Sequence, residues 1–427
     1  MKRRINKYTF TCFALFTALF AACVSYQGSI SNQNMAALYN PAITYLHPQY
    51  EVSHQRDSST MLLVKFFVDE LLFNMANPTK TYKAQLKIHY ELFASLEKGE
   101  LLDTGSVRYL IDRSNAQNEI ISYIPLKTPT KGRFFLRITT TDLVRNSRAQ
   151  TVIELDKTNT YNGQYYSLTS LETKSPMFRN YTNSKESVYL NHNPTSATNL
   201  FLSYYPDELP MALPPFSKNP PFTMPNKPQS LKLVQLVDTV GIRLDKYGLY
   251  YFQVDTAIKT GLSVMNFGEA YPNINTAEQM IEPLRYITKT AEYQELRSAK
   301  NKKLALDNFW LAITNNLVRA KELIRVYYSR ALFANIYFTS FGEGWKTDRG
   351  MIFIVFGPPG SVYKTDNTEK WIYGENANRK PIVFQFRKME NLYSDNHFVL
   401  IRNPKSEGIW MQAVSEWRKG RAFSITN

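Results

Sequence analysis

The chain has 427 residues, a formal net charge of +15 at pH 7, 14% aromatic residues and two cysteines, Cys12 and Cys23. A chain of this length can bury a sizeable core without disulfides, and it predicts two or three domains. One cysteine lies within an N-terminal apolar run and the other directly follows it, which excludes a disulfide, a cysteine-based zinc site and a cysteine nucleophile from the rest of the chain.

The first residues have the composition of a secretory signal peptide. Four cations in the first seven residues precede an acid-free apolar run, Tyr8–Ala22. This run is shorter than the roughly 20 apolar residues of a membrane span, so residues 1–22 are predicted to be a signal peptide. The ending Leu19–Cys23 resembles a bacterial lipobox, and the resemblance implies that Cys23 is acylated, with palmitate among its chains, and begins a tether over residues 23–50. Cleavage by an ordinary signal peptidase near Ala22 is the alternative.

Removal of the four leader cations lowers the net charge from +15 to +11. Export argues against a nucleic-acid partner and leaves lipid headgroups, anionic glycans and acidic proteins as candidates. The cations are spread along the chain instead of forming blocks, so a solvated basic surface is the favoured interpretation.

Two strand-rich regions follow the leader. Residues 51–160 hold six β-branched and aromatic runs separated by turn residues, and they are predicted to form an immunoglobulin-like β-sandwich. Residues 161–274 are predicted to form a second β-rich domain. Its proline-rich loop, 206–228, cannot be a central strand because proline has no amide hydrogen. The apolar residues of this loop are expected either to pack on their own domain or to contact a partner; they include Phe216 and Phe222.

Helical spacing replaces strand alternation over residues 275–340. One helix is expected from a cap at Thr290 to about Asn316, and a second helix follows it. The second helix should bury one stripe, made of Leu317, Ile324, Tyr328, Ala331, Asn335 and Phe338.

The last region, 341–427, is predicted to be a small α+β domain. Met351–Phe356 is apolar at every position, as in a strand buried on both faces, and three later strands would complete an antiparallel sheet with it. Pro358 and Pro359 would end that strand because neither can donate a ladder hydrogen bond.

A final helix ends in a basic cluster, made of Arg418, Lys419 and Arg421. Cations at a helix C-terminus are favoured by the helix dipole, which is one interpretation. Contact with an acidic partner or with lipid headgroups is the other.

The stretch from Phe341 to Gly360 carries a resemblance to a known family. The sequence GWKTDRG followed by an apolar run and GPP is similar to the GWxTD domain of exported bacterial proteins, and flanking segments extend the resemblance over Glu282–Phe386. The matching positions are Gly344, Trp345, Thr347, Asp348, Arg349, Gly350, Gly357, Pro358, Pro359 and Trp371. The resemblance implies a lipoprotein of Bacteroidota-type envelopes, a structural or binding role for these positions, and no established enzymatic activity.

No constellation in the sequence indicates a catalytic or metal site. The five histidines show no metal-ligand spacing, and no G-x-S-x-G nucleophile motif occurs. Neither a cofactor nor a metal is expected. Trp345, Asp348 and Trp371 could serve an envelope enzyme or a glycan-binding site, which is the alternative function.

The sequence therefore predicts a mainly β protein of two immunoglobulin-like sandwiches, an amphipathic helical segment and a small antiparallel-sheet α+β domain. Its expected role is that of a non-enzymatic lipoprotein on the periplasmic face of the outer membrane. There it would be a subunit of a protein secretion or assembly complex. The absence of acidic residues directly after Cys23 favours the periplasmic face, since the resemblance implies acidic residues there for surface export.

Overall fold

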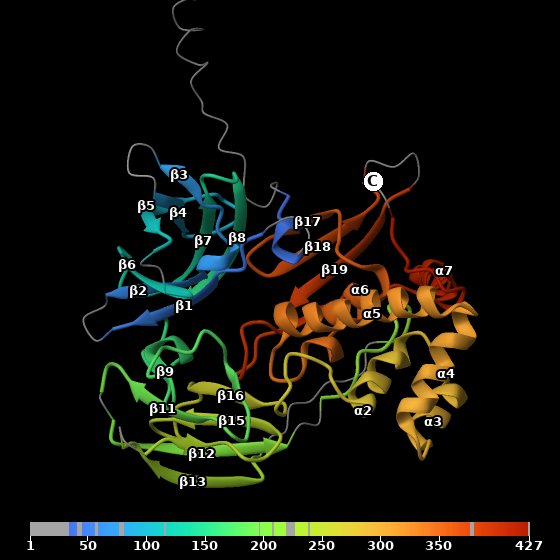
Figure 1. The fold of residues 1–427 in the computed structure, drawn as a ribbon. Helices are drawn as coiled ribbons and strands as arrows, with labels where there is room; N and C mark the ends of the chain where they lie inside the picture. Colours follow the sequence, from blue (N-terminus) through green and yellow to red (C-terminus); the bar gives the residue numbers. More distant parts are fainter. Residues whose placement is uncertain are drawn as a thin grey trace, which may run out of the picture.

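The computed structural model describes residues 34–40, 45–55, 59–76, 81–114, 117–195, 197–206, 209–218, 227–237, 240–375 and 380–425. These residues form two β-sandwiches followed by a region of helices and one sheet, which confirms the mainly β prediction with a C-terminal helical part (Figure 1). Within the described ranges, no helix combines the length and the apolar composition that crossing a bilayer requires.

The first sandwich packs two antiparallel sheets against each other. One sheet has the order β1-β2-β6, with β1 Gln49–His54, β2 Thr60–Phe67 and β6 Glu119–Leu126. The other has the order β3-β4-β7-β8, with β5 also paired to β4. Its strands are β3 Asn74–Ala76, β4 Thr81–Phe93, β5 Leu101–Asp112, β7 Arg133–Asp142 and β8 Ser147–Asp156. Because successive side chains on a strand point to opposite faces, β4 sends Leu86, Ile88, Tyr90 and Leu92 into the core and the odd-numbered residues between them outward.

The second sandwich pairs a small sheet with a larger one. The small sheet, β14-β11-β9, contains β9 Tyr166–Ser170, β11 Ser187–His192 and β14 Ile242–Arg243. The larger sheet, β10-β16-β15-β12-β13, contains β10 Tyr181–Thr182, β12 Asn199–Pro206, β13 Ser230–Gln235, β15 Gly248–Gln253 and β16 Leu262–Asn266. Strand β15 is buried along its whole length, because Tyr250 and Phe252 face the sandwich core while Leu249 and Tyr251 face Tyr393 of the C-terminal region.

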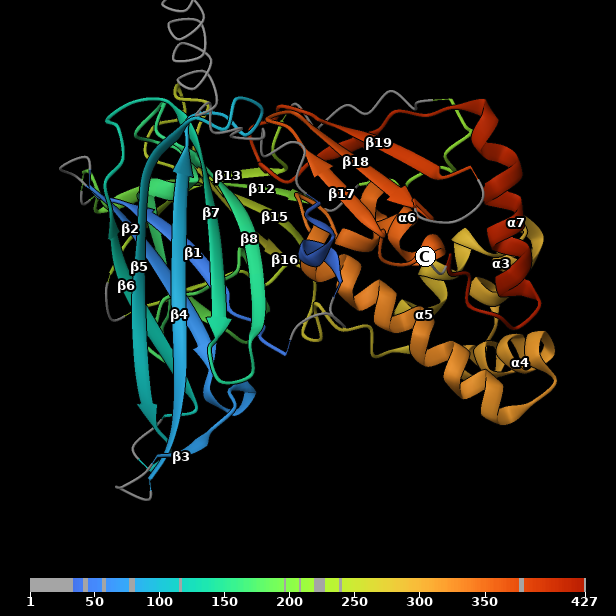
Figure 2. The same cartoon turned by 90° about the horizontal axis from the view of Figure 1, so that it is seen from above.

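The C-terminal region surrounds one helix with other helices and a sheet. The helices are α2 Ala277–Ile281, α3 Thr290–Ser298, α4 Lys302–Thr314, α5 Leu317–Phe338, α6 Asp348–Phe356 and α7 Glu407–Arg418. The antiparallel sheet β17-β18-β19-β20 is made of β17 Ser361–Lys364, β18 Thr368–Tyr373, β19 Ile382–Lys388 and β20 Phe398–Leu400. Helix α6 lies between α5 and this sheet, and every residue of α6 is buried (Figure 2).

The strand predicted at Met351–Phe356 is wrong, because this run is the body of α6. Thr347 caps the helix by accepting a hydrogen bond from the Gly350 amide at 3.0 Å, and Gly357, with φ of 85°, ends it. A helix that is apolar all round belongs in the middle of a core, and a short apolar run has the same appearance in a buried strand. The C-terminal sheet consequently forms without this segment.

The helical predictions upstream were only partly right. The helix expected from Thr290 to Asn316 divides into α3 and α4, since the Asn301 side chain caps α4 by accepting from the Leu304 amide at 3.0 Å. On α5, Leu317 is 59% exposed although it was expected in the buried stripe. The buried face of α5 includes Ala320, Leu323, Tyr327, Ala331, Ala334, Asn335 and Phe338.

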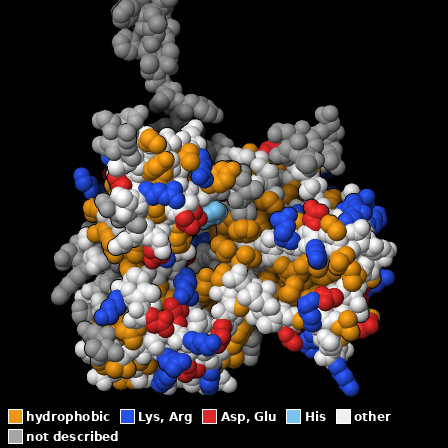
Figure 3. All heavy atoms as spheres, in the orientation of Figure 1, with side chains coloured by type: hydrophobic (Ala, Val, Ile, Leu, Met, Phe, Trp, Pro, Cys, Tyr) orange, Lys and Arg blue, Asp and Glu red, His pale blue; other side chains and the backbone are white. Residues whose placement is uncertain are grey.

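Charged side chains of both signs lie on the face of the molecule that Figure 3 shows. On the face in Figure 3, lysine and arginine side chains occur over both the sandwiches and the helical region, interspersed with acidic and apolar ones.

Candidate functional site

Two glycines allow the turn before α6 to pack tightly. The 3-10 helix η7, Gly344–Lys346, lies against α5 so closely that a Cβ on Gly344 would be 2.1 Å from the Ala334 carbonyl oxygen. A Cβ on Gly350 would be 2.0 Å from the carbonyl oxygen of Gly344. Both contacts are with backbone atoms, which cannot move aside as a side chain can. The glycines of the motif are therefore required by packing of η7 between α5 and α6.

Trp345 and Thr347 fix the turn through hydrogen bonds. The Trp345 amide donates to the Asn335 side chain at 3.0 Å, and its carbonyl accepts from the Tyr286 hydroxyl at 2.9 Å. The Thr347 hydroxyl donates to the carbonyl of Gly344 at 2.7 Å while it caps α6. The indole of Trp345 is 3% exposed and packs edge-on against Tyr286.

Asp348 joins the first turn of α6 to the last strand of the sheet. Its carboxylate accepts hydrogen bonds from the Leu400 amide at 2.8 Å and from both terminal nitrogens of Arg402, at 3.1 and 2.5 Å. Burial raises the pKa of Asp348, and the Arg402 guanidinium and the Leu400 amide oppose that rise. The carboxylate is thus committed to contacts inside the protein.

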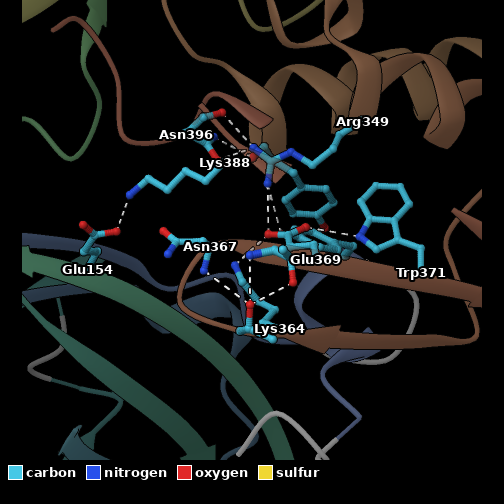
Figure 4. Close-up of polar contacts among 12 residues, drawn as sticks. Glu154, Arg349, Lys364, Asn367, Glu369, Trp371, Lys388 and Asn396 are labelled. Carbon is cyan, nitrogen blue, oxygen red and sulfur yellow. Dashed lines mark hydrogen bonds and ion pairs between the residues drawn. The ribbon is translucent and has the colours of Figure 1, made fainter. Parts of the chain in front are cut away.

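Arg349 enters a buried cluster of charges around Glu369 (Figure 4). Its guanidinium lies 3.1 Å from one Glu369 oxygen and donates to the Asn396 carbonyl at 2.8 Å. The same Glu369 carboxylate is 2.8 Å from the Lys364 ammonium and accepts from the Tyr39 hydroxyl at 2.9 Å. The side chains of Arg349 and Glu369 are 2% and 0% exposed. Two cations thus meet one carboxylate that solvent does not reach, while the Lys364 side chain remains 16% exposed.

The electrostatics of the cluster follow from this geometry. Burial would raise the pKa of Glu369, but Lys364 and Arg349, with hydrogen bonds from Lys364 and Tyr39, outweigh it and lower the pKa to about 2. Burial tends to lower the pKa of Lys364, and the charge of Glu369 reverses this and raises it. Both groups are therefore ionised at neutral pH.

The remaining motif positions are architectural as well. Trp371 is fully buried, and its indole nitrogen donates to Glu369 at 3.2 Å. Gly357 provides the positive φ that ends α6, and its carbonyl accepts from the Tyr373 hydroxyl at 2.9 Å. Pro358 is half-buried and Pro359 buried, directly before β17. The indoles of Trp345 and Trp371 have no free face on which a sugar could stack.

A segment near the N-terminus completes this site, a contact that the sequence did not predict. The Asn34 side chain accepts from the Val362 amide at 3.0 Å and donates to the Gly360 carbonyl at 3.1 Å, while the Met35 amide donates to the Val362 carbonyl at 2.7 Å. The 3-10 helix η3, Ala36–Tyr39, follows and packs between β8 and β17. Residues 34–39 belong to the stretch expected to be a tether, yet Met35, Ala36 and Tyr39 are buried. We name residues 34–39 the docked segment.

The residues predicted to contact a partner, two phenylalanines and the C-terminal basic cluster, differ in their environments. Phe216 is half-buried and packs against the core of the C-terminal region, whereas Phe222 lies outside the described residues. Arg418 pairs with Glu292 at 2.6 Å, and both Lys419 and Arg421 lie within ion-pair distance of Glu416. These three cations have acidic neighbours within the chain. The predicted lipidation site, Cys23, also lies outside the described residues.

Histidines and carboxylates do not assemble into a metal site in the part of the chain that the structure describes. His54 and His192 are buried, with side-chain or backbone partners for both ring nitrogens.

The comparison with protein families supports the resemblance that the GWKTDRG sequence indicated. Residues 248–419 match the GWxTD domain. The GWxTD match extends beyond Glu282–Phe386 at both ends, beginning at β15, which packs on the C-terminal region, and ending just after α7. Solved structures that resemble the chain include the CARDB domain of a Pyrococcus furiosus protein, in complex with di-metal ions. It is 12% identical with a TM-score of 0.14, and the likeness covers 27% of this chain and 93% of that one. None of the curated proteins matches the chain significantly.

Proposed function

We propose that this protein is a non-enzymatic lipoprotein of a Bacteroidota-type outer membrane, held at the periplasmic face by acylated Cys23. It acts as a structural or binding subunit of an envelope complex for protein secretion or assembly. The leader sequence and the motif support the location. Support for a non-enzymatic role comes from the motif side chains Trp345, Asp348 and Arg349, which are buried and make their contacts inside the fold.

The observation that carries the binding role is the exposed strand β13. Among the described residues, it lies at the end of the five-stranded sheet and pairs with β12 along one edge only. Leu231 and Leu233 point to the same face and are 53% and 60% exposed. An edge strand with exposed leucines has unpaired backbone groups and apolar surface together, which an extended segment of a partner protein can cover as an added strand.

The experiment compares two double variants of the full-length, membrane-extracted protein. Leu231→Lys with Leu233→Lys disrupts the β13 surface, and Leu304→Lys with Leu317→Lys is the control on helices, where the leucines are 55% and 59% exposed. We expect the parent and the control to be recovered in stoichiometric complex with defined outer-membrane proteins, and the β13 variant to lose at least about 90% of that recovery.

Three outcomes would contradict the proposal. Equal recovery with both variants would remove β13 from the binding surface, and a monomeric parent would remove the subunit role itself. Binding or cleavage of cell-wall fragments that is lost in a folded Asp348→Ala variant would favour an envelope enzyme or a glycan binder instead. Anchoring is checked separately, since Cys23→Ser should move the protein out of the membrane fraction.

A further inference from the structure

The outer face of the β5-β4-β7-β8 sheet carries a row of cations. This face points away from the β1-β2-β6 sheet and toward the viewer in Figure 2. Lys87 on β4 is directly opposite Arg108 on β5 and Thr141 on β7, and Thr141 is opposite Arg148 on β8. Cross-strand partners share a face, so these four side chains form one row across four strands, with neighbouring strands about 4.8 Å apart. We name Lys87, Arg108, Thr141 and Arg148 the cationic row.

The charges of the cationic row are not balanced within the described residues. Lys87, Arg108 and Arg148 have neither an ion pair nor a side-chain hydrogen bond in that part of the chain. Arg137, two rows away on the same face, forms both an ion pair and hydrogen bonds. Two of its guanidinium nitrogens donate to the two carboxylate oxygens of Glu91, at 2.7 and 2.8 Å. Like charges directly opposite each other on neighbouring strands destabilise a sheet. Lys87 and Arg108 therefore repel each other with no acid between them.

A hollow lies against this row. It has a volume of about 410 Å³, and its lining includes Lys87, His89, Thr139, Thr141, Arg148 and Gln150, together with the Arg137–Glu91 ion pair, in which the carboxylate is already neutralised. Hydroxyl, amide and imidazole groups thus stand next to two of the unbalanced cations. None of the described residues that line the hollow is phenylalanine, tyrosine or tryptophan, so a ligand there would be held mainly by charge and hydrogen bonds.

We propose that the cationic row and the adjoining hollow bind an anionic saccharide, one that carries carboxylate or phosphate groups. The anionic groups neutralise the repulsion along the row, and the sugar hydroxyls meet Thr139, Thr141 and Gln150 in the hollow. A flat bilayer would leave the hollow empty, so lipid headgroups fit the shape less well. This site is separate from β13 and from the GWxTD motif, and it does not depend on the anchor.

The test uses a matched pair of triple variants in the full chain. Lys87→Gln, Arg108→Gln and Arg148→Gln neutralise the row, while Arg319→Gln, Lys321→Gln and Arg325→Gln remove the same charges from exposed positions of α5. The probes are tetragalacturonate, its uncharged methyl ester, and vesicles containing phosphatidylglycerol. We expect the row variant to weaken tetragalacturonate binding at least about tenfold and the α5 variant to leave it nearly unchanged, with weak binding of the ester throughout.

Equal losses in the two triple variants would overturn the proposal, because net charge alone would then explain binding. It would also be overturned if the parent bound no tetragalacturonate, or if the row variant lost vesicle binding only. The melting temperature of the row variant checks that it is folded. Because the substitutions relieve the repulsion, we expect the row variant to melt at the same temperature as the parent or above it.

Discussion

Glu369 brings a lysine, an arginine, a tyrosine and a tryptophan onto one buried carboxylate. Glu369→Gln would leave the buried Arg349 and the largely buried Lys364 without this counter-charge, and we expect it to lower the free energy of unfolding by about 3 kcal/mol or more in denaturant titrations. Asp307→Asn, in the exposed pair with Lys303, should change it by less than about 0.5 kcal/mol. Similar losses in both variants would contradict a special role for the buried charges.

The same residue predicts a pH dependence. Its pKa falls from the ordinary 4.5 to about 2 in the folded protein, so its contribution is fully present above about pH 4.5 and is lost as the pH falls toward 2. We expect the parent to lose more stability than Glu369→Gln between these pH values, measured by denaturant titration at each pH. Parallel curves would contradict the assignment.

At the scale of the element, α6 depends on the close contact of Gly350 with η7. Gly350→Ala places a methyl group against the Gly344 carbonyl, and we expect a loss of at least about 2 kcal/mol in unfolding free energy despite the better helix propensity of alanine. Gly408→Ala in α7 is the control, because a Cβ there meets nothing within 4 Å, and it should stabilise by roughly 0.5–1 kcal/mol. Stabilisation by both substitutions would show that the turn can relax.

At the scale of the whole molecule, the docked segment joins the first sandwich to the C-terminal region. A chain that begins at residue 41 lacks Met35 and Tyr39, which are buried against that region, and should melt about 5 °C or more below a chain that begins at Asn34. The chain that begins at Asn34 is itself the control for removal of residues 1–33. Equal melting temperatures for the two chains would show that docking contributes little stability.

The sequence predicted some regions of the structure better than others. Alternation located β2, β4, β5, β6, β7 and β8 of the first sandwich, because one face of each strand is wet and the other is buried, but it missed β1 at Gln49–His54. It failed at Met351–Phe356, where burial on all sides removes any periodicity. Within the candidate site, the motif positions were found, but their partners Glu369, Arg402 and Tyr39 were not, since these pairings span 20, 54 and 310 residues of the chain.

The sequence by itself determined the mainly β composition, the helical C-terminal part and the motif. Local features of the sequence indicate these three properties: the spacing of apolar residues, the capping residues, and glycines that no other residue can replace. Only the tertiary structure decided that the motif's aspartate and arginine are enclosed, that residues 34–39 pack on the C-terminal region, and that three cations share one row. Those facts depend on side chains brought together across the chain, and burial changes both the charge balance and the exposure of a residue in ways that its neighbours in sequence do not reveal.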